Sequence, residues 1–464
     1  MINKQILNIK FFFIFVVALL ASCSTDSNNL SEIDNRKYAQ EFISSLSPNE
    51  YNQALIKAAI SNHVEVARLL IEKGAKIDYE NKDGYTALIN AAAYNNVEVA
   101  RLLIEKEAKI DYENKTGHTA LINAAAGNSV EVAELLIEKG AKIDYENKDG
   151  YTALINAAAY NNVEVAKLLI EKGAKIDYEN KNGNTALINA AGYNSVEVAR
   201  LLIEKGAKID YENKNGHTAL IDVAYYNNIK IAKLLIVKGA KIDYESKNGY
   251  TALINAAAAN SVEVAKLLIV KGAKIDYESK NGYTALINAA AANSVEVAKL
   301  LIEKGAKIDY ETKDGLTTLI NAAGYSSVEV ARLLIEKGAK IDYESRDSNT
   351  ALINAAANDK RLAAAKLLIE KGAKVDYETK NGLTALINAA GRNSVEVARL
   401  LIEKGAKIDY ENKNGVTALF IAVCCNKPEM VKLLLKYSST KHKALALKIA
   451  KAQGFTEIIN IMTK

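Results

Sequence analysis

Proline and tryptophan are almost absent from this sequence of 464 residues, which contains two prolines and no tryptophan. Because proline interrupts helices, a chain so poor in it favours uninterrupted helical structure. Apolar residues make up 49% of the chain and charged residues 25%, a balance that permits a large buried core and argues against intrinsic disorder. The composition therefore indicates a folded, helix-rich protein.

The residues that carry catalytic and metal chemistry do not cluster. The chain has only four histidines, far apart, and no H-E-x-x-H, C-x-x-C or phosphate-loop motif. Repeated carboxylate pairs such as Asp78 and Glu80 are more typical of solvated loop charges than of an acid–base pair. We therefore expect no enzyme activity, no metal site and no cofactor.

Charge of one sign is not concentrated anywhere in the sequence. The formal net charge is +5, and acids and bases interleave, as they do across residues 98–113. Recognition of nucleic acid needs a basic face, so we do not expect a nucleic-acid partner.

The N-terminus has the pattern of an export signal. Lys4 and Lys10 precede eleven apolar residues, 11–21, and small residues follow. A run of eleven spans only about 16 Å as a helix, roughly half of the hydrocarbon core, which disfavours a transmembrane segment. Residues 1–22 are therefore predicted to be a signal peptide.

The tetrapeptide Leu20-Ala21-Ser22-Cys23 follows the apolar run and resembles the lipobox of bacterial lipoproteins. The resemblance implies that Cys23 becomes lipid-modified, with residues 23–50 forming the anchored N-terminus and a tether. It also implies a place in the bacterial cell envelope, with Ser24 favouring the outer membrane over the inner one and the chain facing the periplasm or the exterior. Cleavage near Ala21 followed by simple secretion is the alternative.

A repeat of 33 residues dominates the rest of the sequence. Glycines recur at that interval from Gly84 to Gly315 and again at Gly382 and Gly415. Repetition at 20 to 50 residues is typical of a solenoid, in which each unit packs only against its neighbours. The period breaks once, because Ser348 replaces a turn glycine and one extra residue lies within 358–362. We expect this irregular unit to fray more easily than the others.

Each repeat contains the parts of a helix–loop–helix unit. In residues 82–114, a turn at Gly84 is followed by Thr86, which is expected to cap a short helix of mostly alanine. The second helix shows apolar residues at spacings of three and four, at Val97, Ala100, Leu103 and Ile104. Ten of eleven copies then have a glycine that suits a left-handed helix end; the exception is Glu107.

The segments T-A-L-I-N-A-A, V-E-V-A-R-L-L-I and G-A-K-I-D of this unit resemble the ankyrin-repeat motif. The resemblance implies an all-α repeat solenoid of paired antiparallel helices with hairpin-like finger loops, spanning residues 51–464 in about thirteen units. Where the family has proline and histidine, this chain has Ala87 and Ile89. Apolar packing by isoleucine should therefore replace the family's histidine hydrogen bonds. The last unit is expected at 446–462.

The resemblance also implies where a protein partner would bind, on the concave side formed by the turn tips and the first helices. Two rows of residues vary at those places while the frame is almost copied. We call the residues after the turn the post-turn row: Tyr85, His118, Tyr151, Asn184, His217, Tyr250, Tyr283, Leu316 and Leu383. We call those at the end of the first helix the helix-end row: Tyr94, Gly127, Tyr160, Tyr193, Tyr226, Ala259, Ala292, Tyr325 and Arg392, of which the tyrosines and Arg392 are the candidate contacts.

Tyrosine is frequent in both rows and suits contact surfaces, because it buries a large area at a small entropic cost. Drift at unconstrained surface sites is an equally weighted alternative. Two further ladders, tyrosines such as Tyr112 and asparagines such as Asn90, recur once per repeat and are predicted to be structural. The adjacent Cys424 and Cys425 are expected to pack as small apolar residues, with pairing to another chain as the alternative.

Together these features predict a monomeric, envelope-anchored lipoprotein that binds another protein. A regulator or immunity-like inhibitor of one envelope protein is an alternative, and a host-interaction adhesin or effector is a further one. The sequence does not identify the partner.

Overall fold

The computed structural model describes residues 30–464, which form two compact units. The predicted signal peptide and Cys23 lie outside these residues. Unit 1 extends to Lys214 and contains α2 (Leu30–Ser44), α3 (Tyr51–Ile60), α4 (Val64–Glu72), α5 (Ala87–Ala93), α6 (Val97–Glu105), α7 (Ala120–Gly127), α8 (Val130–Glu138), α9 (Ala153–Tyr160), α10 (Val163–Glu171), α11 (Ala186–Gly192) and α12 (Val196–Glu204).

Unit 2 runs from Asn215 to Lys464. Its helices are α13 (Ala219–Tyr226), α14 (Ile229–Val237), α15 (Ala252–Ala258), α16 (Val262–Val270), α17 (Ala285–Ala292), α18 (Val295–Glu303), α19 (Thr318–Tyr325), α20 (Val328–Glu336), α21 (Ala351–Ala355), α22 (Leu362–Glu370), α23 (Ala385–Arg392), α24 (Val395–Glu403), α25 (Ala418–Cys424), α26 (Pro428–Leu435), α27 (Thr440–Gln453) and α28 (Thr456–Thr463).

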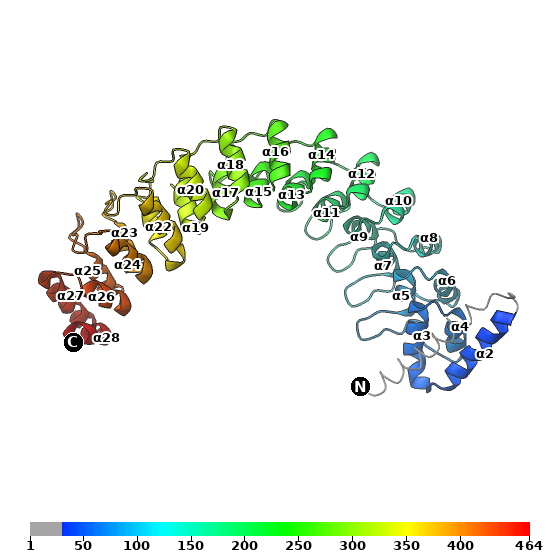
Figure 1. Cartoon of the computed structure of the whole chain (residues 1–464). Helices are drawn as coiled ribbons and strands as arrows, with labels where there is room; N and C mark the ends of the chain where they lie inside the picture. The colour runs from blue at the N-terminus through cyan, green and yellow to red at the C-terminus, as the bar shows by residue number, and fades with distance from the viewer. Residues whose placement is uncertain (1–29) are drawn as a thin grey trace. The chain divides into compact units, whose positions relative to one another are not determined.

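Both units are all-helical solenoids, as the sequence predicts. From α3 to α28 the helices form thirteen successive pairs, and no β-strand occurs between residues 30 and 464. In each unit the first helices of neighbouring pairs pack in one layer and the second helices in another (Figure 1). None of the helices in this part of the chain has the length and apolar character needed to cross a bilayer.

The first helix of each repeat begins at a threonine cap. The Thr86 hydroxyl accepts a hydrogen bond from the Ile89 backbone N–H at 3.3 Å, and most other repeats copy this bond. Ile89 is fully buried, so apolar packing does stand where the family has histidine. In the second helix the buried residues are Val99, Ala100, Leu102 and Leu103, whereas the expected Val97 and Ile104 are only half-buried.

Left-handed residues end the second helices, as predicted. Gly140 has a φ of +96° and Glu107, at the same place in its repeat, has a φ of +70°. A Cβ built on Gly140 would meet no atom within 4 Å. The cost of a non-glycine residue here is therefore backbone strain alone.

The turn glycines of the fingers are needed for a second reason, because the backbone of the next finger approaches them closely. Gly150 has a φ of +80°, and a Cβ there would lie 2.6 Å from the backbone nitrogen of Lys181 in the next finger. The Lys181 N–H donates to the carbonyl of Asp149 at 3.0 Å. Equivalent backbone bonds join successive fingers within each unit from Lys148 to Lys313, whose N–H donates to Asn281 at 3.2 Å. We call the loop that carries each turn residue a finger, and the fingers with turn glycines from Gly84 to Gly315 the regular fingers.

The last three fingers stack differently, and we call them the late fingers. The backbone N–H groups of Arg346, Lys380 and Lys413 donate to glutamate side chains of the preceding finger, at 2.8, 2.8 and 3.0 Å. A Cβ on Gly315 would lie 3.3 Å from the Asp347 backbone nitrogen, and a Cβ on Gly382 would first meet the side chain of Asn412, at 3.0 Å. The late fingers are therefore joined through carboxylates, and their turns are less crowded.

The irregular repeat lies among the late fingers. Ser348 has a φ of +54° in place of the turn glycine, and its first helix, α21, is only five residues long. The extra residue is absorbed in a short 3-10 turn, Asp359–Arg361. Arg361 Nη1 donates to the carbonyl of Asn354 at 2.9 Å, which ties this turn to α21.

The N-terminal boundary differs from the prediction. Helix α2 packs against α4, and Ala39, Phe42 and Ile43 are buried. Tyr38, on the same helix, is 46% exposed. Residues 30–50, assigned above to the tether, therefore form part of the folded body, because their apolar side chains cover the exposed side of the first helix pair.

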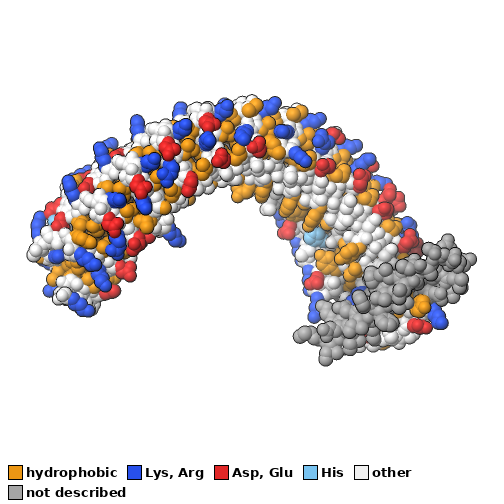
Figure 2. Space-filling model, in the orientation of Figure 1, with side chains coloured by type: hydrophobic (Ala, Val, Ile, Leu, Met, Phe, Trp, Pro, Cys, Tyr) orange, Lys and Arg blue, Asp and Glu red, His pale blue; other side chains and the backbone are white. Residues whose placement is uncertain are grey.

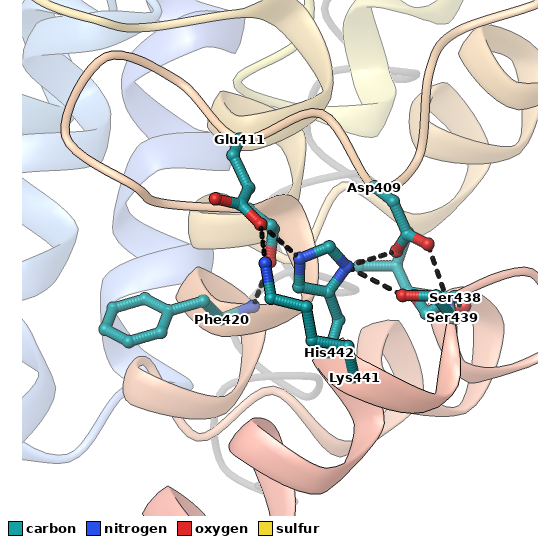
Figure 3. Close-up of polar contacts among 9 residues, drawn as sticks. Asp409, Glu411, Phe420, Ser438, Ser439, Lys441 and His442 are labelled. Carbon is teal, nitrogen blue, oxygen red and sulfur yellow. Dashed lines mark hydrogen bonds and ion pairs between the residues drawn. The ribbon is translucent and has the colours of Figure 1, made fainter.

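The C-terminal unit begins at Thr440, earlier than the expected 446, and has no finger of its own after it. His442 is buried and lies between two carboxylates of the preceding finger (Figure 3). Its Nδ1 lies 3.0 Å from Asp409 Oδ1, and its Nε2 lies 2.8 Å from Glu411 Oε1. The Ser439 N–H also donates to Asp409, at 2.7 Å. Burial opposes it, but these hydrogen bonds hold the pKa of Asp409 below its usual range.

Candidate interaction surface

The tyrosines of the helix-end row are among the most exposed large side chains of the described residues. Each is followed by a left-handed residue, such as Asn161 with a φ of +59°, which ends the first helix and leaves the tyrosine beyond the packed layer. Exposed fractions are 60% for Tyr94, 64% for Tyr160 and 65% for Tyr193 in unit 1, and 57% for Tyr226 and 67% for Tyr325 in unit 2. Arg392 is exposed as well.

The post-turn row is half-buried throughout, which sequence reasoning missed. Its side chains reach the next finger: His118 Nε2 lies 3.1 Å from Asn147 Nδ2, and Asn184 Oδ1 accepts from Asn213 Nδ2 at 2.8 Å. Burial lowers the pKa of His118. The position 29 residues further on carries the signal that could have shown these contacts, because asparagine recurs there.

Three members of the post-turn row differ from this pattern. His217 Nδ1 lies 3.2 Å from Asp222 Oδ1, where other repeats have asparagine on the first helix. Leu316 and Leu383 are half-buried, and their backbone N–H groups donate to threonine hydroxyls at 3.0 and 3.1 Å. These residues shape the surface but offer less polar contact than the tyrosines.

The two rows come together within each unit. In unit 1, burial raises the pKa of Tyr151, and the nearby Tyr193 phenol raises it further. In unit 2, burial raises the pKa of Tyr283, and Tyr325 and Tyr250 add to the shift. In each unit, a half-buried tyrosine of the post-turn row therefore lies near an exposed tyrosine of the helix-end row in the next repeat.

The tyrosine ladder at the finger bases is structural, as predicted. Tyr178 donates to Glu146 of the preceding finger at 2.9 Å, and Lys175 Nζ lies 5.9 Å from the centre of the Tyr178 ring. The bond to Glu179 is the main cause that raises the pKa of Tyr211 to about 12. These tyrosines therefore join one finger to the next, and their hydroxyls are already hydrogen-bonded.

The asparagine ladder is also structural, but its bonds change along the chain. Asn90 Nδ2 donates to the Thr86 carbonyl of its own helix at 2.8 Å. Among the late repeats, Asn354 and Asn388 instead donate to carbonyls of the preceding repeat, at 2.9 and 2.7 Å. Asn321 makes a similar but longer bond to Ile287, at 3.4 Å, so bonds of this kind between repeats begin at Asn321.

The expectation that Cys424 and Cys425 pack in the core is wrong. Both are free and exposed. Cys425 occupies the same place in its repeat as Tyr94, just before a left-handed residue, Asn426, so it points beyond the packed layer rather than into it. Burial, and then the neighbouring Cys425, raise the pKa of the Cys424 thiol.

Charged side chains of both signs are interleaved over most of the surface that Figure 2 shows. Figure 2 shows lysine and arginine beside aspartate and glutamate along the second helices of each unit. Within the described residues, no group of three or more histidine, cysteine, aspartate or glutamate side chains could hold a metal ion.

Comparison with known proteins agrees with this architecture. A family model described as "Ankyrin repeats (3 copies)" matches residues 30–114, 106–180, 176–246, 222–312, 307–379 and 362–444. Among solved structures, the chain is similar to the human ASB11 ankyrin repeat domain, with 28% sequence identity over 48% of this chain and 99% of that one, and a TM-score of 0.44. No curated protein matches. The helix pairs, the capped repeats and the family match together show that the chain belongs to the ankyrin-repeat family.

Proposed function

We propose that this ankyrin-repeat scaffold is an envelope-anchored lipoprotein that binds another protein, as a monomer, through the aromatic surfaces of its two units. The observation that carries the proposal is the helix-end row, where bulky tyrosines stand 57–67% exposed beside half-buried ones. Exposure of so much aromatic area costs free energy in water, and a partner that covers it recovers that free energy.

Tyrosine suits this role because it is rigid and combines a large apolar ring with a hydroxyl that can donate or accept. Tyr193 beside Tyr151, and Tyr325 beside Tyr283, offer such rings together with a neighbour that is already fixed. The rows contain no cluster of groups suited to catalysis, and the proposed activity is binding alone.

Site-specific photocrosslinking in intact cells tests the surface. A photoreactive amino acid at Tyr193 or Tyr325 should capture a partner, whereas the same group at the exposed Lys167 or Lys299 on the second helices should capture little of it. A single product of near-equal stoichiometry would favour a regulator of one protein, and several products a scaffold. Equal capture from both layers would contradict the proposed surface.

The anchor rests on the lipobox-like segment that ends at Cys23. We expect labelled palmitate to enter the wild-type protein and the protein to fractionate with membranes, because two or more acyl chains hold a protein firmly on a bilayer. Cys23→Ser should abolish both. The double variant Cys424→Ser, Cys425→Ser is the matched control and should keep both; palmitate in Cys23→Ser would contradict the anchor.

A further inference from the structure

Two neighbouring second helices of unit 2 differ from their counterparts in a way that the binding rows do not explain. In nine other repeats the second helix ends in glutamate, at positions 72, 105, 138, 171, 204, 303, 336, 370 and 403. Helices α14 and α16 end instead in Val237 and Val270, and each valine is 77% exposed. These two are more exposed than the helix-end tyrosines.

The two valines form one strip because α14 and α16 pack side by side. They occupy the same place in successive repeats, so they are separated by about one interhelical distance, roughly 8–10 Å. Leu234 and Leu267, one turn earlier on the same helices, are half-buried, as Leu201 and Leu300 are at the same place in the adjoining repeats, so the valines add exposed apolar area beside them. The apolar strip therefore runs from one helix to the next.

The charge around the strip is also altered. Lys230 stands where the other regular second helices have a glutamate, so α14 contains Lys230 and Lys233 and no acid. Lys238 and Lys271 follow the two valines, and all four lysines are exposed. Within residues 36–464, the salt bridges include none from these four; the neighbouring Lys266 is paired with Glu263 at 3.1 Å. We call the two valines and these four lysines the α14–α16 patch.

We propose that the α14–α16 patch is a second docking surface, and that it binds an acidic amphipathic helix of a partner protein. Loss of three carboxylate positions leaves an uncompensated cationic rim, which complements an acidic segment. Apolar side chains seven residues apart on a helix lie about 10.5 Å apart, close to the interval between the two valines. An anionic membrane fits less well, because two valines alone contribute little to insertion.

A designed peptide tests this surface on the full chain. The probe is a fluorescent, lactam-stabilised acidic helix of about 16 residues, with two leucines seven positions apart and glutamates beside them. We expect it to bind the wild-type protein at least about tenfold more tightly than the triple variant Lys230→Glu, Val237→Glu, Val270→Glu. That variant only restores residues that the other repeats carry at these positions, so it should fold.

A matched control separates the patch from general charge. Arg101→Glu with Lys167→Glu changes the net charge by the same amount on exposed positions of unit 1 and should leave peptide binding nearly unchanged. Equal peptide binding by the wild type and the triple variant, or no binding by either, would overturn the proposal. So would patch-dependent binding to phosphatidylglycerol vesicles, or self-association of the chain, without peptide binding. The proposed tyrosine surface is read separately, by crosslinking at Tyr193 and Tyr325.

Discussion

The regular and late fingers have nearly the same sequence but are joined in different ways. Between regular fingers, a backbone N–H meets a backbone carbonyl, as Lys181 meets Asp149 at 3.0 Å. Between late fingers, the same N–H meets a carboxylate, as Lys413 meets Glu378 at 3.0 Å. The comparison separates two demands on the turn glycine: a positive φ, which both regions need, and close approach, which the regular fingers need most.

This difference explains where the one non-glycine turn residue falls. Ser348 lies among the late fingers, and a Cβ on the preceding turn glycine, Gly315, would lie 3.3 Å from its nearest neighbour rather than 2.6 Å as at Gly150. A serine side chain at such a turn therefore adds backbone strain without a backbone clash. The same replacement among regular fingers would separate two fingers.

The largest expected effect compares Gly150→Ala with Gly315→Ala. Both impose a positive φ on alanine, but the added Cβ lies 2.6 Å from a backbone nitrogen of the next finger in the first and 3.3 Å in the second. We expect Gly150→Ala to lower the free energy of unfolding by about 2–4 kcal/mol and Gly315→Ala by about 1 kcal/mol. Urea denaturation of the two variants measures the difference, and equal losses would remove the distinction between the regions.

The next largest effect is expected for Glu107→Gly, which should stabilise the protein. Glu107 holds a φ of +70° where ten other copies have glycine with open space around it. Relief of that strain should raise the free energy of unfolding by about 1 kcal/mol. A lower melting temperature for this variant would show that the residue is held by contacts and not merely strained.

The third prediction uses pH. Hydrogen bonds from Lys413 and Tyr410 lower the pKa of Glu378, so the stability they contribute is present above the unfolded value of about 4.3 and is lost as pH falls through the folded pKa. In Glu378→Gln, hydrogen exchange at the Lys413 amide should be faster, because the free energy of local opening should fall by about 0.5–1 kcal/mol. Glu146→Gln is the control, because the Lys181 amide bonds a carbonyl instead.

The smallest effect is expected at the irregular turn. Ser348→Gly relieves a φ of +54° but removes a hydroxyl that bonds Glu344. These contributions offset each other, so the free energy of unfolding should change by less than about 0.5 kcal/mol. Stabilisation as large as that of Glu107→Gly, in the same thermal measurement, would show that the hydroxyl contributes nothing.

Most of the repeat architecture could be predicted because its signals are local. A threonine that caps a helix, and a glycine that takes a positive φ, act within a few residues of their own position. Gly84, Thr86 and Glu107 were assigned correctly on that basis. The change from a carbonyl acceptor between regular fingers to a carboxylate acceptor between late fingers could not be predicted. The segments E-S-K-N at 278–281 and E-T-K-N at 378–381 are almost the same sequence.

The surface was less predictable because it depends on contacts between repeats. The post-turn row is half-buried since its side chains touch a finger 29 residues further on, a distance that no local pattern reveals. Cys425 is exposed because a left-handed residue follows it. At the α14–α16 patch the sequence shows only that glutamates are replaced. The structure adds that Val237 and Val270 are exposed, which makes the patch apolar.

The burial of His442 against Asp409 and Glu411 has a consequence for how copies of this chain behave in a crowded compartment. A stack of nearly identical modules presents at its tip the same acceptors that hold its interior together, and such a tip invites head-to-tail growth into filaments. An imidazole and the Ser439 amide already bond those acceptors in the last finger, so the two carboxylates are less available to a backbone donor of another molecule than they would be in an open finger.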